Sequence, residues 1–241
     1  MQKQDKIDFS RTDKTSQTLS VLEDYVAQQQ REHDSSHLNC PTNSSSEITE
    51  DDVEIEDADY KFELTNKSFK KAILDCYMIF RAKLEDYGPS WRIMRPVSVT
   101  DQIYIKANRI RNLETIPTHY VGEGILPEFQ AIVNYCIVGL IQLKYGHSEV
   151  SKDISNEQAC EWYEKFAQEA YDLMIKKNHD YNEAWKLMRV NSYTDFILMK
   201  LFRVMEIEEH DGVTRVSEPI SSNYMDIMNY AVFGIIKLTQ K

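Results

Sequence analysis

The chain has 241 residues, of which 42% are hydrophobic and 11% aromatic, enough for a substantial core in one large domain or two small ones. The first 60 residues hold 5 Lys+Arg against 15 Asp+Glu and carry nearly all of the net charge of −11; the others hold 23 against 24. The near-neutral remainder lacks the basic field with which proteins track long nucleic acids.

The sequence shows none of the usual signs of a membrane span, a secretory signal or a zinc site. We find no run of the ~18–20 uncharged apolar residues that a membrane span needs, and the first residues have no apolar core. The four cysteines show no CxxC spacing. Cys76, Cys136 and Cys160 lie in apolar helical patterns and are predicted to be small buried hydrophobes. A reducing, cytoplasmic location is therefore expected.

Residues 1–60 are predicted to be a disordered acidic tail, because they contain too little apolar surface to offset the entropy of ordering. Within this tail, residues 20–30 (SVLEDYVAQQQ) are the one stretch with a helical pattern, which places Leu22, Tyr25 and Val26 on one stripe. This stretch is either a short docking helix or part of a solvated tail.

From about residue 66 the chain repeats itself. DYGPSW at 86–91 returns as DYNEAW at 180–185, a spacing of 94, and after one inserted residue the spacing becomes 95. The matched pairs are Lys83/Lys177, Asp86/Asp180, Tyr87/Tyr181, Trp91/Trp185, Met94/Met188, Arg95/Arg189, Ser98/Ser192, Thr100/Thr194, Asp101/Asp195, Lys106/Lys200, Arg109/Arg203, Glu114/Glu208, Glu123/Glu218, Asn134/Asn229, Tyr135/Tyr230 and Gly139/Gly234. Charged, aromatic and glycine positions coincide together, which indicates two tandem repeats, at 66–146 and 157–241.

Each repeat predicts three helices, of which the first covers residues 67–85 and 157–179. Gly88 and Asn182 follow these helices at matching positions. Both residue types tolerate the left-handed conformation that ends a helix, so the repeated DYG and DYN are interpreted as helix stops.

The second helix is predicted to begin at Ser98 and Ser192, because each serine precedes an aspartate by three residues, as in a capping box. The third helix has apolar residues at the i, i+3, i+4, i+7 spacing of a buried face. These residues are Phe129, Ile132, Val133, Cys136, Ile137 and Leu140 in one repeat, and Tyr224, Ile227, Met228, Ala231, Val232 and Ile235 in the other. With no sustained alternation of period two, the prediction is all-α: two three-helix repeats packed as one pseudo-twofold bundle.

The repeated phrases resemble a known family. WRIMRPVSVTDQIYIKANRIR at 91–111, together with DYNEAW, KLFRVMEIEE, SEPI and DIMNYAVFGIIKL in the second repeat, is similar to the nucleotide modification associated family, formerly a domain of unknown function. The resemblance covers residues 66–241. It implies an all-α domain, found in bacteria and phages, whose phage members lie near nucleotide-processing genes.

A more distant similarity is to the MazG-like all-α nucleotide pyrophosphatases, which hold magnesium with an EExxE pair and a later ExxD. This chain lacks EExxE at the matching place, and its nearest substitute is DIMN at 226–229. An amide there replaces the second carboxylate, which leaves pyrophosphatase activity open.

Basic residues shared by both repeats are the candidate phosphate ligands. Lys106 and Arg109 lie three residues apart, as do Lys200 and Arg203, so each pair shares one helix face. Cations on an apolar helix need anions. A phosphate bound by these four residues and Arg189 is one source, and internal salt bridges are the other. The internal candidates are Asp180, Asp195, Glu206 and Asp226.

One acidic position differs between the repeats, since Ala131 stands where Asp226 stands. We expect Asp226, Glu218 and Asp180 to hold Mg²⁺ at the second repeat, and the first repeat to bind ligand weakly. The alternative for Asp226 is a solvated acid near a helix N-terminus. As an exposed residue, its replacement by alanine should cost less than ~1 kcal/mol of stability.

Trp91 and Trp185 follow the helix stops at matching positions. Each either stacks on a nucleotide base or closes the core between two helices. Taken together, the sequence predicts a nucleotide-binding protein of nucleotide metabolism whose reaction, if it is an enzyme, is magnesium-dependent phosphoanhydride hydrolysis. The alternative is a non-catalytic interaction or sensor module with a buried polar network. No membrane or zinc is expected, and a homo-oligomer is left open.

Overall fold

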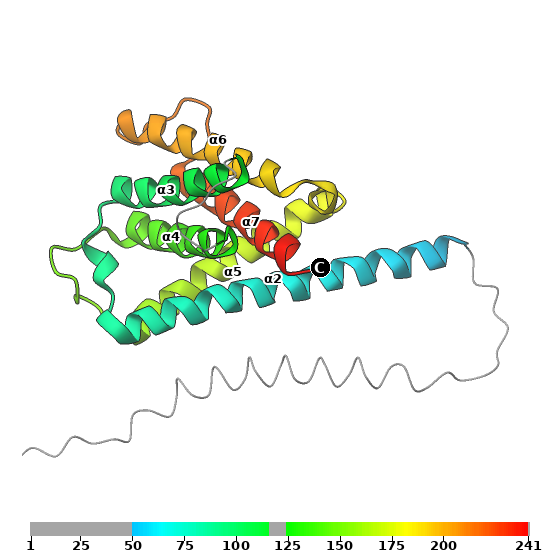
Figure 1. Cartoon of the computed structure of the whole chain (residues 1–241), viewed down its shortest axis with the longest axis horizontal. Helices are drawn as coiled ribbons and strands as arrows, with labels where there is room; N and C mark the ends of the chain where they lie inside the picture. Colours follow the sequence, from blue (N-terminus) through cyan, green and yellow to red (C-terminus); the bar gives the residue numbers. More distant parts are fainter. Residues whose placement is uncertain (1–49, 116–123, 241) are drawn as a thin grey trace, which may run out of the picture. The chain divides into compact units, whose positions relative to one another are not determined.

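The computed structural model describes residues 50–115 and 124–240, so most of the predicted tail and the helix expected over 20–30 lie outside the described residues. The described part contains six α-helices, two short 3₁₀ turns and no strand (Figure 1). They are α2 (Glu50–Tyr87), η1 (Ser90–Ile93), α3 (Pro96–Thr115), α4 (Leu126–Tyr145), α5 (Asn156–Asp180), η2 (Ala184–Leu187), α6 (Val190–Glu209) and α7 (Ile220–Thr239). The predicted all-α class is confirmed. Because α2 begins at Glu50, residues 50–60 belong to the first helix rather than to a tail.

The predicted helix stops are confirmed in both repeats. Gly88 follows α2 with φ +71°, and its N–H donates to the Leu84 carbonyl at 2.9 Å. After α5, Asn182 and Glu183 take φ values of 44° and 54°. The second repeat therefore turns with two left-handed residues where the first uses one glycine, and each stop leads into a 3₁₀ turn that the sequence did not predict.

The predicted capping boxes are wrong, because α3 and α6 both begin two residues earlier than expected. Pro96 takes the first position of α3, where proline is favoured because no N–H partner is required there. The Ser98 N–H donates to the Arg95 carbonyl at 2.9 Å, so this serine lies inside the first turn. In the second repeat the cap residue is Arg189, without a side-chain cap bond, and Ser192 likewise lies inside.

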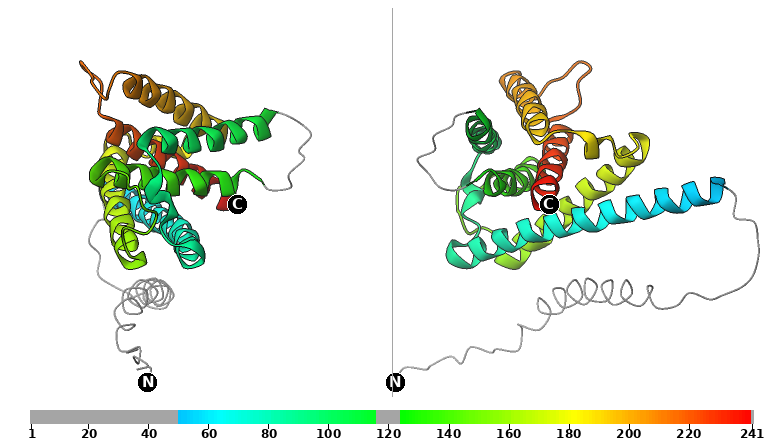
Figure 2. Two further views of the ribbon diagram at one scale, coloured as in Figure 1. Left: turned by 90° about the vertical axis from the view of Figure 1, so that its left-hand side faces the viewer. Right: turned by 45° about the vertical axis from the view of Figure 1, so that its right-hand side comes forward.

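The helices form three layers within residues 54–241. Helices α4 and α7 lie side by side in the middle layer, α3 and α6 pack on one side of them, and α2 and α5 lie on the other (Figures 1 and 2). All the apolar residues predicted for the third helices are buried. Helix α4 is long and apolar enough to cross a membrane, contrary to our expectation of no such stretch, but 61% of that stretch is buried, as in the core helix of a fold.

The two middle helices cross where each places a glycine against an aromatic ring of the other. A Cβ on Gly139 would lie 2.6 Å from the Tyr224 ring, and a Cβ on Gly234 would lie 3.0 Å from the Phe129 ring. Gly139 matches Gly234 and Phe129 matches Tyr224 at the spacing of 95. The same contact is thus made twice, as a twofold axis between the repeats requires.

Polar contacts between the repeats obey the same symmetry. Thr100 donates to Glu208 at 2.7 Å, and the matching Thr194 donates to Glu114 at 3.1 Å. Burial raises the pKa of both glutamates above the usual value. Tyr224 breaks the equivalence, because its hydroxyl lies 2.6 Å from that of Thr100 and the matching Phe129 has no hydroxyl. The predicted pseudo-twofold bundle is confirmed.

We predict that Gly139→Ala lowers the free energy of unfolding by about 2–3 kcal/mol, because the new methyl group must displace the Tyr224 ring from a filled core. Gly234→Ala should cost less, since its contact is longer. Urea denaturation monitored by circular dichroism measures both losses. Gly124→Ala is the control, because nothing lies within 4 Å of a Cβ there. Equal stability of the Gly139 and Gly124 variants would contradict the close crossing.

Candidate functional site

In the first repeat, the paired cations of the second helix bind a buried acid that the sequence did not single out. Glu128 on α4 is 2% exposed. It accepts a hydrogen bond from Arg109, and Lys106 Nζ lies 3.2 Å from its other carboxylate oxygen. The first repeat lacks an acid at Ala131, the position of Asp226, and Glu128 supplies the carboxylate instead.

In the second repeat the acid is Asp226, and it is buried rather than solvated. Only 6% of Asp226 is exposed on α7. Lys177 of α5 donates to one carboxylate oxygen, and Lys200 Nζ of α6 lies 2.6 Å from the other. The alternative of a solvated, exposed acid is wrong, since residues 226–229 are all buried and α7 is covered on every side at this level.

The buried acid has moved by one helical turn between the repeats. At the spacing of 95, Glu128 corresponds to Asn223, and Asp226 corresponds to Ala131. A shift of three residues moves a side chain one turn along the same face of a helix. The acid pairs with the equivalent lysine in both repeats, Lys106 or Lys200, but its second cation differs: Arg109 in the first repeat and Lys177 in the second.

This shift changes which cation of each repeat is not paired with the buried acid. Arg109 is bound to Glu128, but the matching Arg203 is exposed and forms no ion pair with any side chain that the structure describes. Arg203 donates a long hydrogen bond to Met199 Sδ at 3.8 Å. In exchange, Lys177 is bound to Asp226, whereas the matching Lys83 is exposed. The second repeat therefore presents a guanidinium to solvent where the first presents an ammonium group.

Tyr230 is half-buried on α7, one helical turn after Asp226. Burial raises the pKa of its hydroxyl; Asp226 and Tyr181 add to the increase, and Lys177 and Arg203 oppose it. These four groups therefore lie within electrostatic reach of the hydroxyl. The sequence shows Tyr230 only as one of the matched pairs of the repeat, with Tyr135. That match of a polar aromatic residue was the one sign in the sequence that this position could belong to the site.

The amide of the DIMN sequence has a structural role. Asn229 Nδ2 donates to the Ala170 carbonyl at 3.2 Å, and the matching Asn134 Nδ2 donates to the Cys76 carbonyl at 3.1 Å. Each bond joins the third helix of a repeat to its first helix at equivalent positions. The Nδ2 of Asn229 thus serves the packing between helices.

The three predicted magnesium ligands are not gathered into one set. Asp226 is bound by two lysines, Glu218 is exposed in the loop before α7, and Asp180 is exposed beside His179 at 3.3 Å. Among the described residues, no group of three or more His, Cys, Asp or Glu could hold a metal ion. Magnesium binding by these residues stays a prediction.

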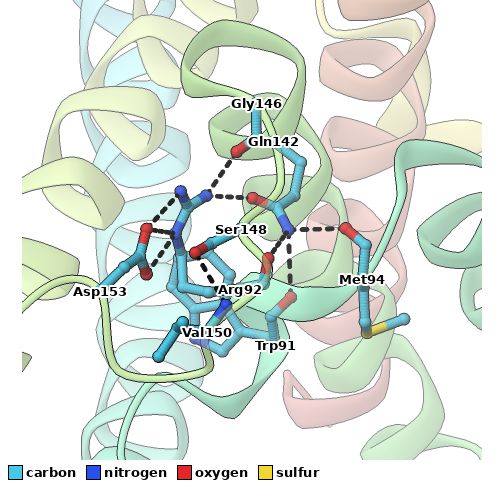
Figure 3. A network of polar contacts seen from close by, with 8 residues as sticks. All are labelled: Trp91, Arg92, Met94, Gln142, Gly146, Ser148, Val150 and Asp153. Carbon is cyan, nitrogen blue, oxygen red and sulfur yellow. Dashed lines mark hydrogen bonds and ion pairs between the residues drawn. The ribbon is translucent and has the colours of Figure 1, made fainter.

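Arg92, a basic residue of η1, is used by the fold and is not available to bind a ligand. It is 4% exposed, and its Nε and Nη2 donate hydrogen bonds to the Asp153 carboxylate (Figure 3). Its Nη1 donates to Gln142 Oε1 and to the Gly146 carbonyl. Gln142 in turn donates to the carbonyls of Trp91, Arg92 and Met94 at 2.7–3.1 Å. This network fixes η1 on the end of α4.

The tryptophans predicted to stack on a base are used by the fold. Trp185 is 8% exposed and its ring lies parallel to Phe233, with centroids 4.5 Å apart. Trp91 is half-buried beside Phe80 at 6.2 Å. Of the predicted phosphate ligands, Arg189 is exposed at the start of α6. The structure therefore brings Lys200 and Asp226 together, places Arg203 on the same helix three residues from Lys200, and leaves the tryptophans in the packing between helices.

We predict that Asp226→Ala lowers the free energy of unfolding by roughly 3 kcal/mol, because it leaves the buried Lys200 without its carboxylate. The value below ~1 kcal/mol expected for an exposed position no longer applies. Lys200→Met in the same chain should recover part of the loss, since it removes the unpaired charge. Chemical denaturation of the single and double variants measures this, with the exposed Asp180→Ala as control. A cost equal to that of the control would contradict the buried ion pair.

A model of the nucleotide modification associated domain 1 family matches residues 83–143 and 177–238, which together make up just over half of the chain. The two matches begin at Lys83 and Lys177, which are equivalent positions of the repeats. They contain Glu128, Asp226 and the matched cations of the second helices, Lys106, Arg109, Lys200 and Arg203. No curated protein and no solved structure matches the chain significantly.

Proposed function

The chain belongs to the nucleotide modification associated domain 1 family, and we propose from this that it binds the phosphate of a nucleotide at its second repeat. The observation that carries the proposal is Arg203, an exposed arginine without an acidic partner among the described side chains. Its repeat equivalent, Arg109, is bound to Glu128. A cation that has lost its internal partner is the group that an external anion can engage.

The surroundings of Arg203 support a phosphate. Lys177 and Lys200 share a single carboxylate, Asp226, and Arg203 lies three residues from Lys200 on α6, so this part of the second repeat carries more positive than negative charge. A guanidinium presents paired donors that suit phosphate oxygens, and the lysines add point charges. The Tyr230 hydroxyl lies within electrostatic reach of Lys177 and Arg203 and would add a donor. Arg203 would therefore bind the phosphate directly, with the lysines supporting it from the more buried side.

Magnesium-dependent hydrolysis would be a further step beyond phosphate binding. The residues expected to bind the metal do not fit a site built by the protein, because Asp226 is taken by two lysines and the other two acids are exposed. If magnesium takes part, it would enter with the phosphates of the nucleotide. We derive no catalytic step from this arrangement.

A second candidate function is a non-catalytic interaction or sensor module. It is favoured by the internal pairing of both buried acids, Glu128 and Asp226, which satisfies four of the cations without any ligand. In this case the polar clusters would only specify how the helices pack. The two candidates differ in whether any nucleotide stabilises the folded state.

Thermal unfolding with a panel of nucleotides, with and without magnesium, separates the candidates. A ligand at 100 times its dissociation constant should add roughly 2.7 kcal/mol of apparent stability. We predict that Arg203→Ala abolishes this shift and leaves the melting temperature of the free protein nearly unchanged, because Arg203 is exposed. Arg81→Ala is the matched control, since Arg81 pairs with Glu85 on its own helix. Lys200→Ala should weaken the shift more than Lys106→Ala.

Two outcomes would contradict this proposal. Absence of a shift with every nucleotide would favour the interaction module. A shift that survives Arg203→Ala, or that Arg81→Ala removes equally, would place the ligand elsewhere on the chain.

A further inference from the structure

We infer that the nucleotide of the proposed function is a nucleoside monophosphate whose base lies on Phe196 of α6. This inference rests on the proposed function, because it takes the phosphate to be held at Arg203. It replaces the predicted stacking on Trp185, whose ring is buried against Phe233.

Phe196 and Arg203 lie on one exposed stripe of α6. Positions 196, 199 and 203 are exposed and follow the i, i+3, i+7 spacing of a single helix face, with the buried Lys200 beside them. Phe196 is 37% exposed and Met199 is 41% exposed, so the stripe presents an aromatic and a thioether surface to solvent. The stripe therefore runs from an apolar platform to a cation.

The Phe196 ring packs against Tyr230, whose hydroxyl lies within electrostatic reach of Arg203 and Lys177. Its centroid lies 5.4 Å from that of Tyr230, with the planes tilted by 49°. Edge or tilted ring pairs of this kind fix ring orientation. One face of the platform is thus supported by the fold, while the exposed part can receive a base.

The first repeat supports the assignment by contrast. Gln102 stands at the position of Phe196, so no ring is present beside Tyr135 at the equivalent place. Its arginine, Arg109, is also bound to an acid. The exposed ring and the unpaired arginine therefore occur in the same repeat and are both missing from the other.

The spacing and the charge favour one phosphate. Phe196 and Arg203 are seven residues apart, about 10 Å along a helix. Side chains on a helix lean toward its N-terminus, so the long Arg203 side chain can shorten this distance to one that a sugar spans between a stacked base and its phosphate. Asp226 and its two lysines, Lys177 and Lys200, carry a net charge of +1, and Arg203 raises the sum for the four residues to +2. A phosphate monoester carries about −1.5 to −2 at neutral pH, so it balances this excess, and a triphosphate would exceed it.

The test compares ribonucleoside 5′-monophosphates with ribose 5-phosphate by calorimetric titration. At least one monophosphate should bind roughly 5- to 100-fold more tightly than ribose 5-phosphate, the range that stacking of a base on an aromatic ring gives. Phe196→Ala should remove this advantage and leave the affinity for ribose 5-phosphate unchanged. Phe196→Leu, which keeps apolar bulk, should do the same if the alanine variant proves unstable.

Phe202→Ala is the matched control, because Phe202 is a 53% exposed phenylalanine of the same helix that packs against Tyr104 instead of Tyr230. It should change neither affinity. Equal binding of ribose 5-phosphate and every monophosphate, with dependence on Arg203, would overturn the base platform and leave the phosphate site standing. Tighter binding of triphosphates than of monophosphates would overturn the assignment of one phosphate. Failure of all probes to bind would overturn the proposed function itself.

Discussion

The close crossing of α4 and α7 is the contact on which the rest of the structure depends. Gly139 and Gly234 have no side chains, so the aromatic rings of Tyr224 and Phe129 can lie directly on the opposite helix backbone. Both helices are thereby buried on nearly all sides, and the outer layers must pack on either face of the pair. The buried acids occur next to these rings in the sequence, since Glu128 precedes Phe129 and Asp226 comes two residues after Tyr224. The crossing therefore also sets where each carboxylate meets the cations of the second helices.

Each buried carboxylate is a requirement of this packing as much as a feature of a site. A lysine such as Lys200, at 7% exposure, is tolerated in a core only with a charged partner. Either of two positions on the third helix can supply the partner, because both lie on the face turned toward the second helix. The choice of position decides which cation is held by the fold and which is free to meet solvent. Moving the buried acid by one helical turn thus changes which charged group is exposed at the surface.

The sequence predicted the fold well because its signals are local or repeated. The helix stops at Gly88 and Asn182 and the apolar faces of the third helices depend on short-range geometry, and the structure confirms them. The burial of Asp226 could not be predicted in this way. Periodicity places this acid off the apolar stripe, but α5 and α6 cover that side as well. The unpaired state of Arg203 was equally hidden, because it depends on Asn223 across the helix interface. The base platform was assigned to the tryptophans by residue type, since nothing in the sequence tells a buried ring from an exposed one.

The single hydroxyl that distinguishes Tyr224 from Phe129 shows what covalent duplication permits. In a dimer of identical chains, any substitution beside the axis appears in both subunits and must suit both environments at once. In the fused chain, one half can hold Tyr224 with its hydroxyl 2.6 Å from Thr100, while the other half keeps a plain ring. Joining the halves therefore releases each from the other's constraints. One half can preserve the shared architecture while the other diverges.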